Sequence, residues 1–174
     1  MRITGALAAA GTLLLGGIAG HAGAAPPAAD RSAVAVCHPP ALVVWLDTRG
    51  DGAAGSTFYD LVFTNLSART CRLSGYPGVS AVTAGGARLG RPAGRDTTRA
   101  PRAVRLAPGA SAVTTLRIVD VLNYPAALCR PVMAAGLRVY PPGSTRSARV
   151  PFPFRACSRG GPQFLSVRAV RIRA

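Results

Sequence analysis

The fold of this chain is decided most directly by the stretch Phe58-Tyr59-Asp60-Leu61-Val62-Phe63-Thr64-Asn65. Tyr59, Leu61 and Phe63 fall on one face of an extended chain, whereas an aspartate and a threonine lie between and after them on the other face. This period of two is typical of a β-strand with one buried face. The stretch therefore predicts a strand whose apolar side chains belong to the core.

The residues that follow predict a turn, a second strand and a corner. Asn65 ends the first strand with a side chain that can bond the following backbone, as in an Asx-turn. Cys71 and Leu73 continue the alternation in a short strand. Gly75-Tyr76-Pro77-Gly78 then supplies two glycines that allow a tight corner, with the tyrosine ring covering the edge of the core. We expect this corner to be architectural.

Short β segments dominate the rest of the chain. Gly- and Pro-containing turns separate them, and only residues 124–128 could form a helical turn. The spacing predicts an all-β protein, an antiparallel two-sheet sandwich of about seven to nine short strands. The further predicted strands are residues 42–46, 79–83, 104–106, 112–119, 137–140 and 164–172.

The composition limits both the class of protein and its chemistry. The 174 residues include 21 basic and six acidic side chains, all of them Arg and Asp, for a formal charge of +15. The absence of Lys and Glu is largely what GC-rich codons encode. Fifteen prolines argue against long helices, and a positive mean hydropathy argues against a disordered polycation.

The N-terminus predicts export. Arg2 precedes an apolar run over residues 3–18, and Ala22-Gly23-Ala24 has the small-x-small pattern of a signal-peptidase site. We therefore predict a signal peptide over residues 1–24 with cleavage near Ala24. The run of about 16 residues is short of the roughly 20 that span a bilayer, so we expect no transmembrane span in the mature chain.

Cleavage would leave one domain in the extracellular medium or the cell envelope. It removes one arginine, so the charge of +15 becomes +14. We expect residues 25–36, which are rich in Ala and Pro, to form a flexible lead-in. Residues 37–174 are then a single β-sandwich domain, whose length suits one core. We expect this protein to be a monomer.

All four cysteines, Cys37, Cys71, Cys129 and Cys157, follow the predicted signal peptide. An even number in an exported chain predicts two disulfides, for which three pairings are possible. We favour Cys37–Cys71 and Cys129–Cys157, because these pairs are neighbours in sequence and enclose loops of similar size. No Cys-x-x-Cys pair exists, so we expect no metal site.

These landmarks, in this order, resemble the exported and mostly actinobacterial family called domain of unknown function 4232. The resemblance extends from Cys37 to the end of the chain, and its most specific part is residues 65–79. It implies an immunoglobulin-like sandwich with two disulfides and supports the pairing favoured above, but it implies no known activity and no catalytic residue. The residues that carry it are Leu61-Val62-Phe63-Thr64-Asn65-Leu66-Ser67, Thr70-Cys71-Arg72-Leu73, Gly75-Tyr76-Pro77-Gly78-Val79, Leu106-Ala107-Pro108-Gly109, Ser111-Ala112, Cys129, Leu137-Arg138-Val139 and Cys157.

The remaining side chains argue against catalysis. General acid–base chemistry needs His, Glu or paired carboxylates, and His38 is the sole imidazole after the signal peptide. No Gly-x-Ser-x-Gly elbow is present. Residues 47–52 resemble the start of a calcium loop, but Arg49 stands where an oxygen ligand is required, and we expect a hairpin turn there. We predict a non-enzymatic protein without cofactors, and a hydrolase centred on His38 is the least favoured alternative.

The distinctive chemical feature is a cluster of arginines opposed only by Asp96. Pro92, Gly94 and Pro101 interrupt their spacing of three or four, so we expect an extended, mobile basic loop rather than a helix. A second basic stretch, Arg168, Arg171 and Arg173, lies near the C-terminus. The six arginines of the cluster are Arg88, Arg91, Arg95, Arg99, Arg102 and Arg105.

The cluster has two functional interpretations, in addition to the non-functional one that it is simply a solvated surface. The first is contact with anionic envelope polymers or lipid headgroups through the six arginines. The alternative is a protein-interaction module, in which strand edges and end loops engage another exported protein. We do not expect nucleic acid as a partner, because export separates the chain from it and few aromatic residues accompany the arginines.

Overall fold

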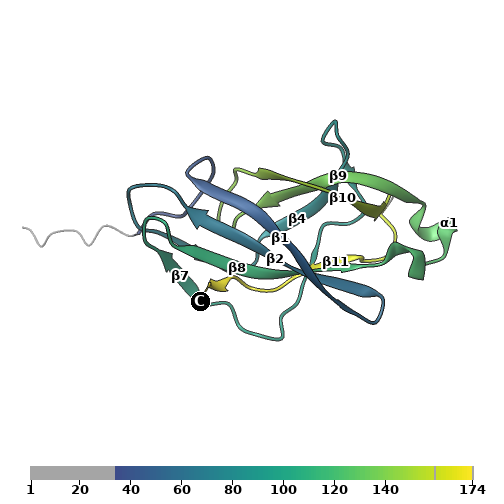
Figure 1. The fold of residues 1–174 in the computed structure, drawn as a ribbon, viewed down its shortest axis with the longest axis horizontal. Coiled ribbons are helices and arrows are strands. Elements are labelled where there is room, and N and C mark those ends of the chain that lie inside the picture. Colours follow the sequence, from purple (N-terminus) through teal and green to yellow (C-terminus); the bar gives the residue numbers. More distant parts are fainter. Residues whose placement is uncertain (1–33, 159, 174) are drawn as a thin grey trace, which may run out of the picture. The chain divides into compact units, whose positions relative to one another are not determined.

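The computed structural model describes residues 34–158 and 160–173. The predicted signal peptide (1–24) and the lead-in up to residue 33 lie outside the described residues. The described part is mostly β-structure with one short α-helix (Figure 1). Its elements are β1 (Leu42–Ala53), β2 (Ser56–Asn65), β3 (Cys71–Ser74), β4 (Gly78–Val82), β5 (Arg88–Leu89), β6 (Gly94–Arg95), β7 (Ala103–Leu106), β8 (Ser111–Val119), the 3-10 turn η1 (Val121–Asn123), α1 (Ala126–Cys129), β9 (Pro131–Tyr140), β10 (Ala148–Cys157), β11 (Leu165–Val167) and β12 (Arg171–Ile172).

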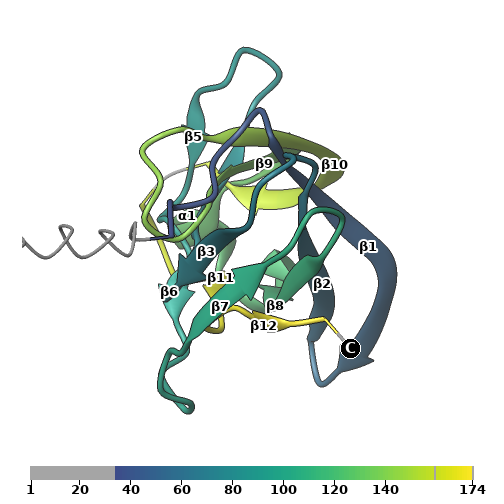
Figure 2. The same cartoon turned by 90° about the vertical axis from the view of Figure 1, so that its left-hand side faces the viewer.

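The strands form three open sheets. The largest has the order β1-β2-β8-β11-β6, and β12 pairs with β8 beside β11. A four-stranded sheet has the order β10-β9-β4-β5, and β3 pairs with β7 alone. All pairs are antiparallel except β11 with β6. Figure 2, a view down the longest axis, shows β7 and β12 lying near each other.

One buried cluster joins the inner faces of the six-stranded and four-stranded sheets. Leu61 and Phe63 of β2 are fully buried in it, as are Leu116 of β8 and Leu137 of β9. The predicted core face of β2 is confirmed, since Tyr59 also packs against this cluster. The opposite face is buried too at Val62, which is 0% exposed, lies outside the cluster and pairs with the buried Val113 of β8. A mostly β fold with two disulfides is confirmed as well, whereas the immunoglobulin-like arrangement stays a prediction.

β10 was not predicted, because Pro151 and Pro153 interrupt its apolar pattern. The strand lies at the edge of its sheet, where one side of the backbone has no ladder to donate to. A missing N–H is tolerated there. The ladder with β9 is irregular between Pro151 and Phe154, which is where the prolines fall. With the two-residue β5 and β6, and with 164–172 divided into two strands, the described residues contain twelve strands.

The prediction of a hairpin turn at residues 47–52 was wrong. β1 continues to Ala53, and its ladder with β2 is irregular between Asp47 and Asp51. The turn lies at Ala54 and Gly55, which both have positive φ angles. The Asp47 carboxylate accepts hydrogen bonds from the backbone and side chain of Arg49 and stabilises the irregular segment instead of a turn.

The disulfides join Cys37 to Cys71 and Cys129 to Cys157, which is the predicted pairing. The first bond fixes the start of the described chain beside β3. Residues 34–36, placed by the sequence in the flexible lead-in, are bonded there too, because the Arg72 N–H donates to the Ala35 carbonyl and Val36 forms a parallel bridge with Arg72. None of the helices in the described residues is long and apolar enough to cross a membrane.

Candidate anion-binding groove

The six clustered arginines separate in the structure. The segment that contains them is not one continuous loop, because it includes β5, β6 and the start of β7. Arg88 lies in β5 at the edge of the four-stranded sheet, and Arg91 is exposed just after it. Arg95 lies in β6 with its guanidinium carbon 5.6 Å from the Tyr76 ring centre. Only the last three members reach a common cavity.

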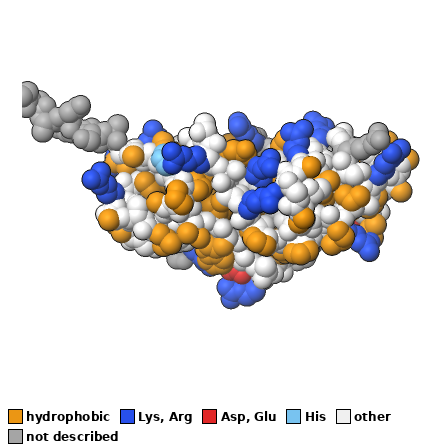
Figure 3. Space-filling model, turned by 90° about the horizontal axis from the view of Figure 1, so that it is seen from above, with side chains coloured by type: hydrophobic (Ala, Val, Ile, Leu, Met, Phe, Trp, Pro, Cys, Tyr) orange, Lys and Arg blue, Asp and Glu red, His pale blue; other side chains and the backbone are white. Residues whose placement is uncertain are grey.

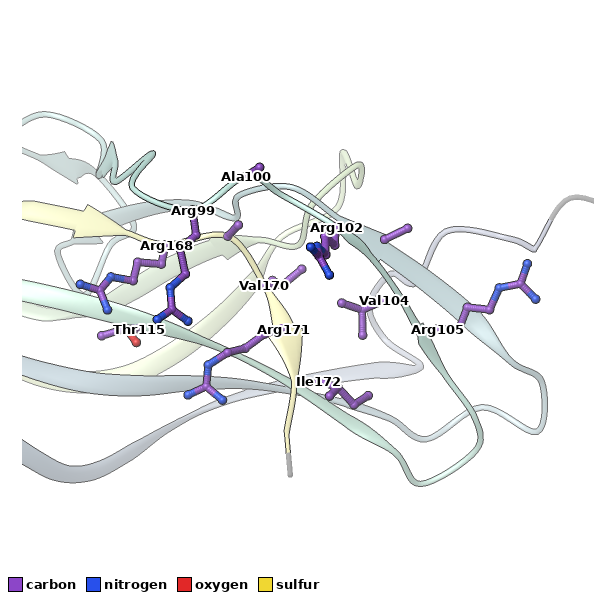
Figure 4. A pocket seen from close by; sticks show the side chains of 12 residues that line it. Arg99, Ala100, Arg102, Val104, Arg105, Thr115, Arg168, Val170, Arg171 and Ile172 are labelled. Atoms are coloured by element: carbon purple, nitrogen blue, oxygen red, sulfur yellow. The ribbon is translucent and has the colours of Figure 1, made fainter.

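This cavity, which we call the arginine groove, has a volume of about 990 Å³. One wall is the segment around β7, and the other consists of residues 168–170, which follow β11, and of β12 itself (Figure 4). Two basic stretches far apart in sequence therefore face the same space. The lining residues are Arg99, Ala100, Arg102, Ala103, Val104, Arg105, Thr115, Arg168, Ala169, Val170, Arg171 and Ile172.

Apolar and basic side chains line different parts of the groove. Val104 and Val170 are buried members of the core cluster, and Ile172 beside them is 51% exposed. Figure 4 shows Arg99, Arg168 and Arg171 extending toward the Thr115 end of the cavity, whereas Arg105 points the other way. The groove thus has an apolar floor and a basic rim.

The guanidiniums of Arg99, Arg102 and Arg171 make no side-chain hydrogen bond or ion pair within residues 34–158 and 160–173. Other arginines are engaged in the structure. Arg138 donates to the Gly86 carbonyl at 2.6 Å and Arg149 donates to the Ala84 carbonyl at 3.2 Å. Each guanidinium carries five N–H donors in a planar fork that matches carboxylates and phosphates. The groove therefore gathers donors that the protein itself leaves free.

Arg168 is the groove arginine with an acidic partner. Its Nε donates to the Asp96 carboxylate at 2.9 Å. Hydrogen bonds from Arg168 and then from Thr98 lower the pKa of Asp96 to about 2. Asp96 stays charged over the physiological range, so this pair orients Arg168 and takes up part of its charge.

A smaller cavity of about 170 Å³ adjoins the groove and shares Thr115 and Arg168 with it. Arg117 lines this cavity, with its Nε bonded to the Ser56 hydroxyl and its guanidinium carbon 6.0 Å from the Phe58 ring centre. The positive charge therefore continues beyond the Thr115 end of the groove.

The Gly75-Tyr76-Pro77-Gly78 corner holds both walls of the groove. The Tyr76 hydroxyl donates to the Arg99 carbonyl at 3.3 Å, and the Val170 N–H donates to the Gly75 carbonyl at 2.9 Å. Gly75 has φ +105°, a conformation that side-chain-bearing residues rarely adopt. The corner that the sequence marks as architectural thus positions the arginine-bearing segments.

Charge elsewhere is dispersed or paired. Figure 3 shows arginine side chains scattered over one face among hydrophobic ones, with little acidic surface in view. On the large sheet, Asp47 pairs with Arg49 at 2.9 Å and with Arg173 at 3.5 Å. The hydrogen bonds from Arg49 lower the pKa of Asp47 to about 2. Arg173 also lies over Trp45, 5.1 Å from its ring centre, so it secures the C-terminal strand.

The groups considered for catalysis do not assemble with one another. Among the described residues no three His, Cys, Asp or Glu side chains come together as a metal ion would need. His38 is exposed beside the Cys37–Cys71 disulfide. The expected absence of catalysis, metal and cofactor stays a prediction.

The sequence marks the groove only in part. It identified Arg99, Arg102 and Arg105 as candidate contacts and noted Arg168 and Arg171 as a separate basic stretch. Nothing in the spacing indicates that these stretches meet, because the meeting depends on β12 returning beside β8. Arg88, Arg91 and Arg95 fall outside the groove lining.

Comparison with known proteins finds one family. The model of a domain of unknown function, DUF4232, matches residues 37–171. No curated protein and no solved structure matches the chain.

Proposed function

The chain belongs to the DUF4232 family, and we propose that it is a non-enzymatic module that binds anionic macromolecules of the cell envelope or the extracellular medium through the arginine groove. The observation that carries this proposal is the gathering of Arg99, Arg102, Arg168 and Arg171 around one cavity. Three of these four guanidiniums have no partner among the described residues. Positive charge in a concave site attracts anions more strongly than the same charge dispersed.

An extracellular location agrees with this role. The predicted signal peptide over residues 1–24 would export the chain, and two disulfides are typical of proteins from oxidising compartments. We further propose that the fold is an immunoglobulin-like sandwich, supported by the core shared between the large and the four-stranded sheet. A mature exported protein whose mass corresponds to a start at Ala25 would support the location. Intracellular retention of the uncleaved chain would contradict it.

A pair of charge-matched triple variants tests the anion site. The groove triple replaces Arg99, Arg102 and Arg171 by Ser. The control triple replaces Arg88, Arg91 and Arg146, which are exposed and lie outside the groove. Both remove three charges, so any difference between them reports position rather than net charge.

The measurement is the Kd for polyglutamate and for polyphosphate as a function of salt concentration. We expect the groove triple to bind the preferred polyanion about tenfold or more weakly than the wild type, with a flatter salt dependence. The control triple should lose much less. Equal losses in the two triples would mean that the binding reflects overall charge, and the proposed site would be wrong.

A protein partner is the second candidate, and the groove favours it by a specific observation. Two of the strands that border the cavity, β7 and β12, each have one edge without a partner strand in the described residues. Exposed edges are where sandwiches accept an added strand. A hydrolase centred on His38 gains no support, since His38 lines a separate cavity of about 350 Å³ whose described lining includes no Asp or Glu to orient the imidazole.

A further inference from the structure

Two free strand edges border the arginine groove from opposite walls. β7 pairs with β3 alone, and β12 pairs with β8 alone, within the residues that the structure describes. Residues of both strands line the same cavity. These edges can pair with a ligand only if their unpaired backbone N–H and carbonyl groups point away from the strands to which they are already bonded.

On β7, the hydrogen bonds of the opposite strand reveal which groups face the groove. Arg72 of β3 uses its N–H and its carbonyl on the side away from β7, bonding to Ala35 and Cys37. Arg105 stands opposite Arg72 in the ladder. Because bonded and non-bonded pairs alternate along an antiparallel ladder, the N–H and carbonyl of Arg105, and those of Ala103, point away from β3.

On β12, the same reasoning identifies Ile172. The Arg173 N–H donates to the Ser111 carbonyl at 3.0 Å, so Arg173 faces β8. Ile172, the residue before it, then directs its N–H and carbonyl away from β8. No backbone bond of these outward groups of β7 and β12 occurs among the described residues. The groove therefore offers unpaired donors and acceptors on both sides.

We propose that the ligand of the arginine groove is an extended, acidic segment of an exported partner protein, which inserts between β7 and β12 as an added strand. This inference rests on the proposed function and names the partner at the same site. A polypeptide supplies donors and acceptors at the spacing that both edges require. A phosphate or sugar polymer does not repeat that spacing, so it would satisfy the arginines but not the backbone groups.

The side chains of the groove predict the sequence pattern of that segment. Val104 and Val170 present an apolar floor, and the guanidiniums of Arg99, Arg102 and Arg171 present a basic rim. Successive side chains of a strand point to opposite faces. An inserted strand with alternating apolar and acidic residues would place one set on the floor and the other on the rim.

The test uses the oxidised protein and three short peptides of equal charge. The first alternates Val and Asp over eight residues. The second has the same composition in two blocks, and the third is the alternating peptide with its valine amides N-methylated. We expect the alternating peptide to bind about tenfold or more tightly than either of the others, because only it combines the pattern with a complete set of backbone donors.

A second readout locates the bound peptide. Hydrogen exchange of the Ala103, Arg105 and Ile172 amides should slow when the alternating peptide binds, since these N–H groups gain acceptors. Ala103→Pro removes one such donor at the first residue of a strand, a position that tolerates proline. This variant should weaken binding of the alternating peptide, because the peptide carbonyl that faces residue 103 loses its donor.

Each result that contradicts strand insertion leads to a different conclusion about the ligand. Equal affinity for all three peptides, without slower exchange, would overturn strand insertion and leave anion binding intact. Tighter binding of polyphosphate than of any peptide would identify a phosphate polymer as the ligand and overturn the inference. A dimer that protects the same amides without peptide would identify a second copy as the occupant and also overturn it. If neither peptides nor polyphosphate bind, the proposed function itself fails.

Discussion

At the scale of single residues, the corner at Gly75 and Tyr76 connects the architecture to the groove. Its two hydrogen bonds reach the Arg99 carbonyl and the Val170 N–H, one on each wall. The guanidinium of Arg95 also lies over the Tyr76 ring. The corner therefore holds the backbone at one position on each wall, at Arg99 and at Val170.

Tyr76→Phe should test this placement with little effect on the core. The ring remains beneath Arg95, but the bond to the Arg99 carbonyl is lost. We expect a loss of about 1 kcal/mol or less in the free energy of unfolding, together with weaker polyanion binding. Urea denaturation and a binding isotherm measure the two effects. Tyr140→Phe, at an exposed tyrosine without a side-chain hydrogen bond in the described residues, should change neither. Unaltered anion affinity of Tyr76→Phe would show that this bond does not position Arg99.

Asp96 predicts a defined acid response. Its folded pKa of about 2 lies below the ordinary value of 3.8, so its stabilising effect is full above about pH 4 and is lost as the pH falls through about 2. Asp96→Asn should lower stability at pH 7 and flatten its decline between pH 4 and pH 2. Asp47 contributes in the same window, so the decline becomes shallower without vanishing.

The same substitution should strengthen anion binding at neutral pH, because it releases Arg168 from its carboxylate. Asp60→Asn is the control, since Asp60 has no arginine partner in the described residues. If the free energy of unfolding of Asp96→Asn falls between pH 4 and pH 2 in parallel with that of the wild type, the ion pair does not have this role.

At the scale of elements, strand edges explain several features of this fold. β10 tolerates Pro151 and Pro153 because it is an edge strand, and the prolines discourage any further strand from pairing there. β7 and β12 contain no proline, and their edges line the groove. One edge is thus protected against pairing, whereas the two beside the arginines are open to it.

Gly136 shows how closely β9 and β10 approach. A Cβ at this position would collide with the Val150 carbonyl and lie 3.0 Å from the Phe152 nitrogen, both of which are backbone atoms. We expect Gly136→Ala to lower the free energy of unfolding by about 1–3 kcal/mol. Gly52→Ala, where nothing lies within 4 Å, should change it by less than about 0.5 kcal/mol. Equal stability of the two variants in urea would contradict this description of the β9–β10 pairing.

At the scale of the whole molecule, the sequence predicts elements better than their assembly. Alternation identified β2 and β8, because a period of two is a local signal. The cysteines indicated the disulfide pairing, because four cysteines allow only three pairings. β10 was missed because edge position, not sequence, permits its prolines. The groove could not be predicted, because Arg99 and Arg171 are brought together by the pairing of β12 with β8.

The two disulfides should stabilise the fold by comparable amounts. Their sequence separations are 34 and 28 residues, and loop entropy then assigns each about 3.5–4 kcal/mol as an upper figure. Replacing both cysteines of either pair by Ser should lower the free energy of unfolding by up to that amount. Neither bond lines the groove, so polyanion affinity should persist wherever the variant remains folded. Loss of binding by a folded variant would indicate that the groove depends on the crosslink.

We propose above all that anions bind at the arginine groove rather than over the whole basic surface. Arginine side-chain NMR during a polyglutamate titration tests this directly, because it needs no substitution. We predict that the Nε–H signals of Arg99, Arg102, Arg168 and Arg171 shift together and saturate, whereas those of Arg88, Arg91 and Arg146 move little. Small, unsaturated shifts of similar size at all arginines, or the largest shifts outside the groove, would contradict the account.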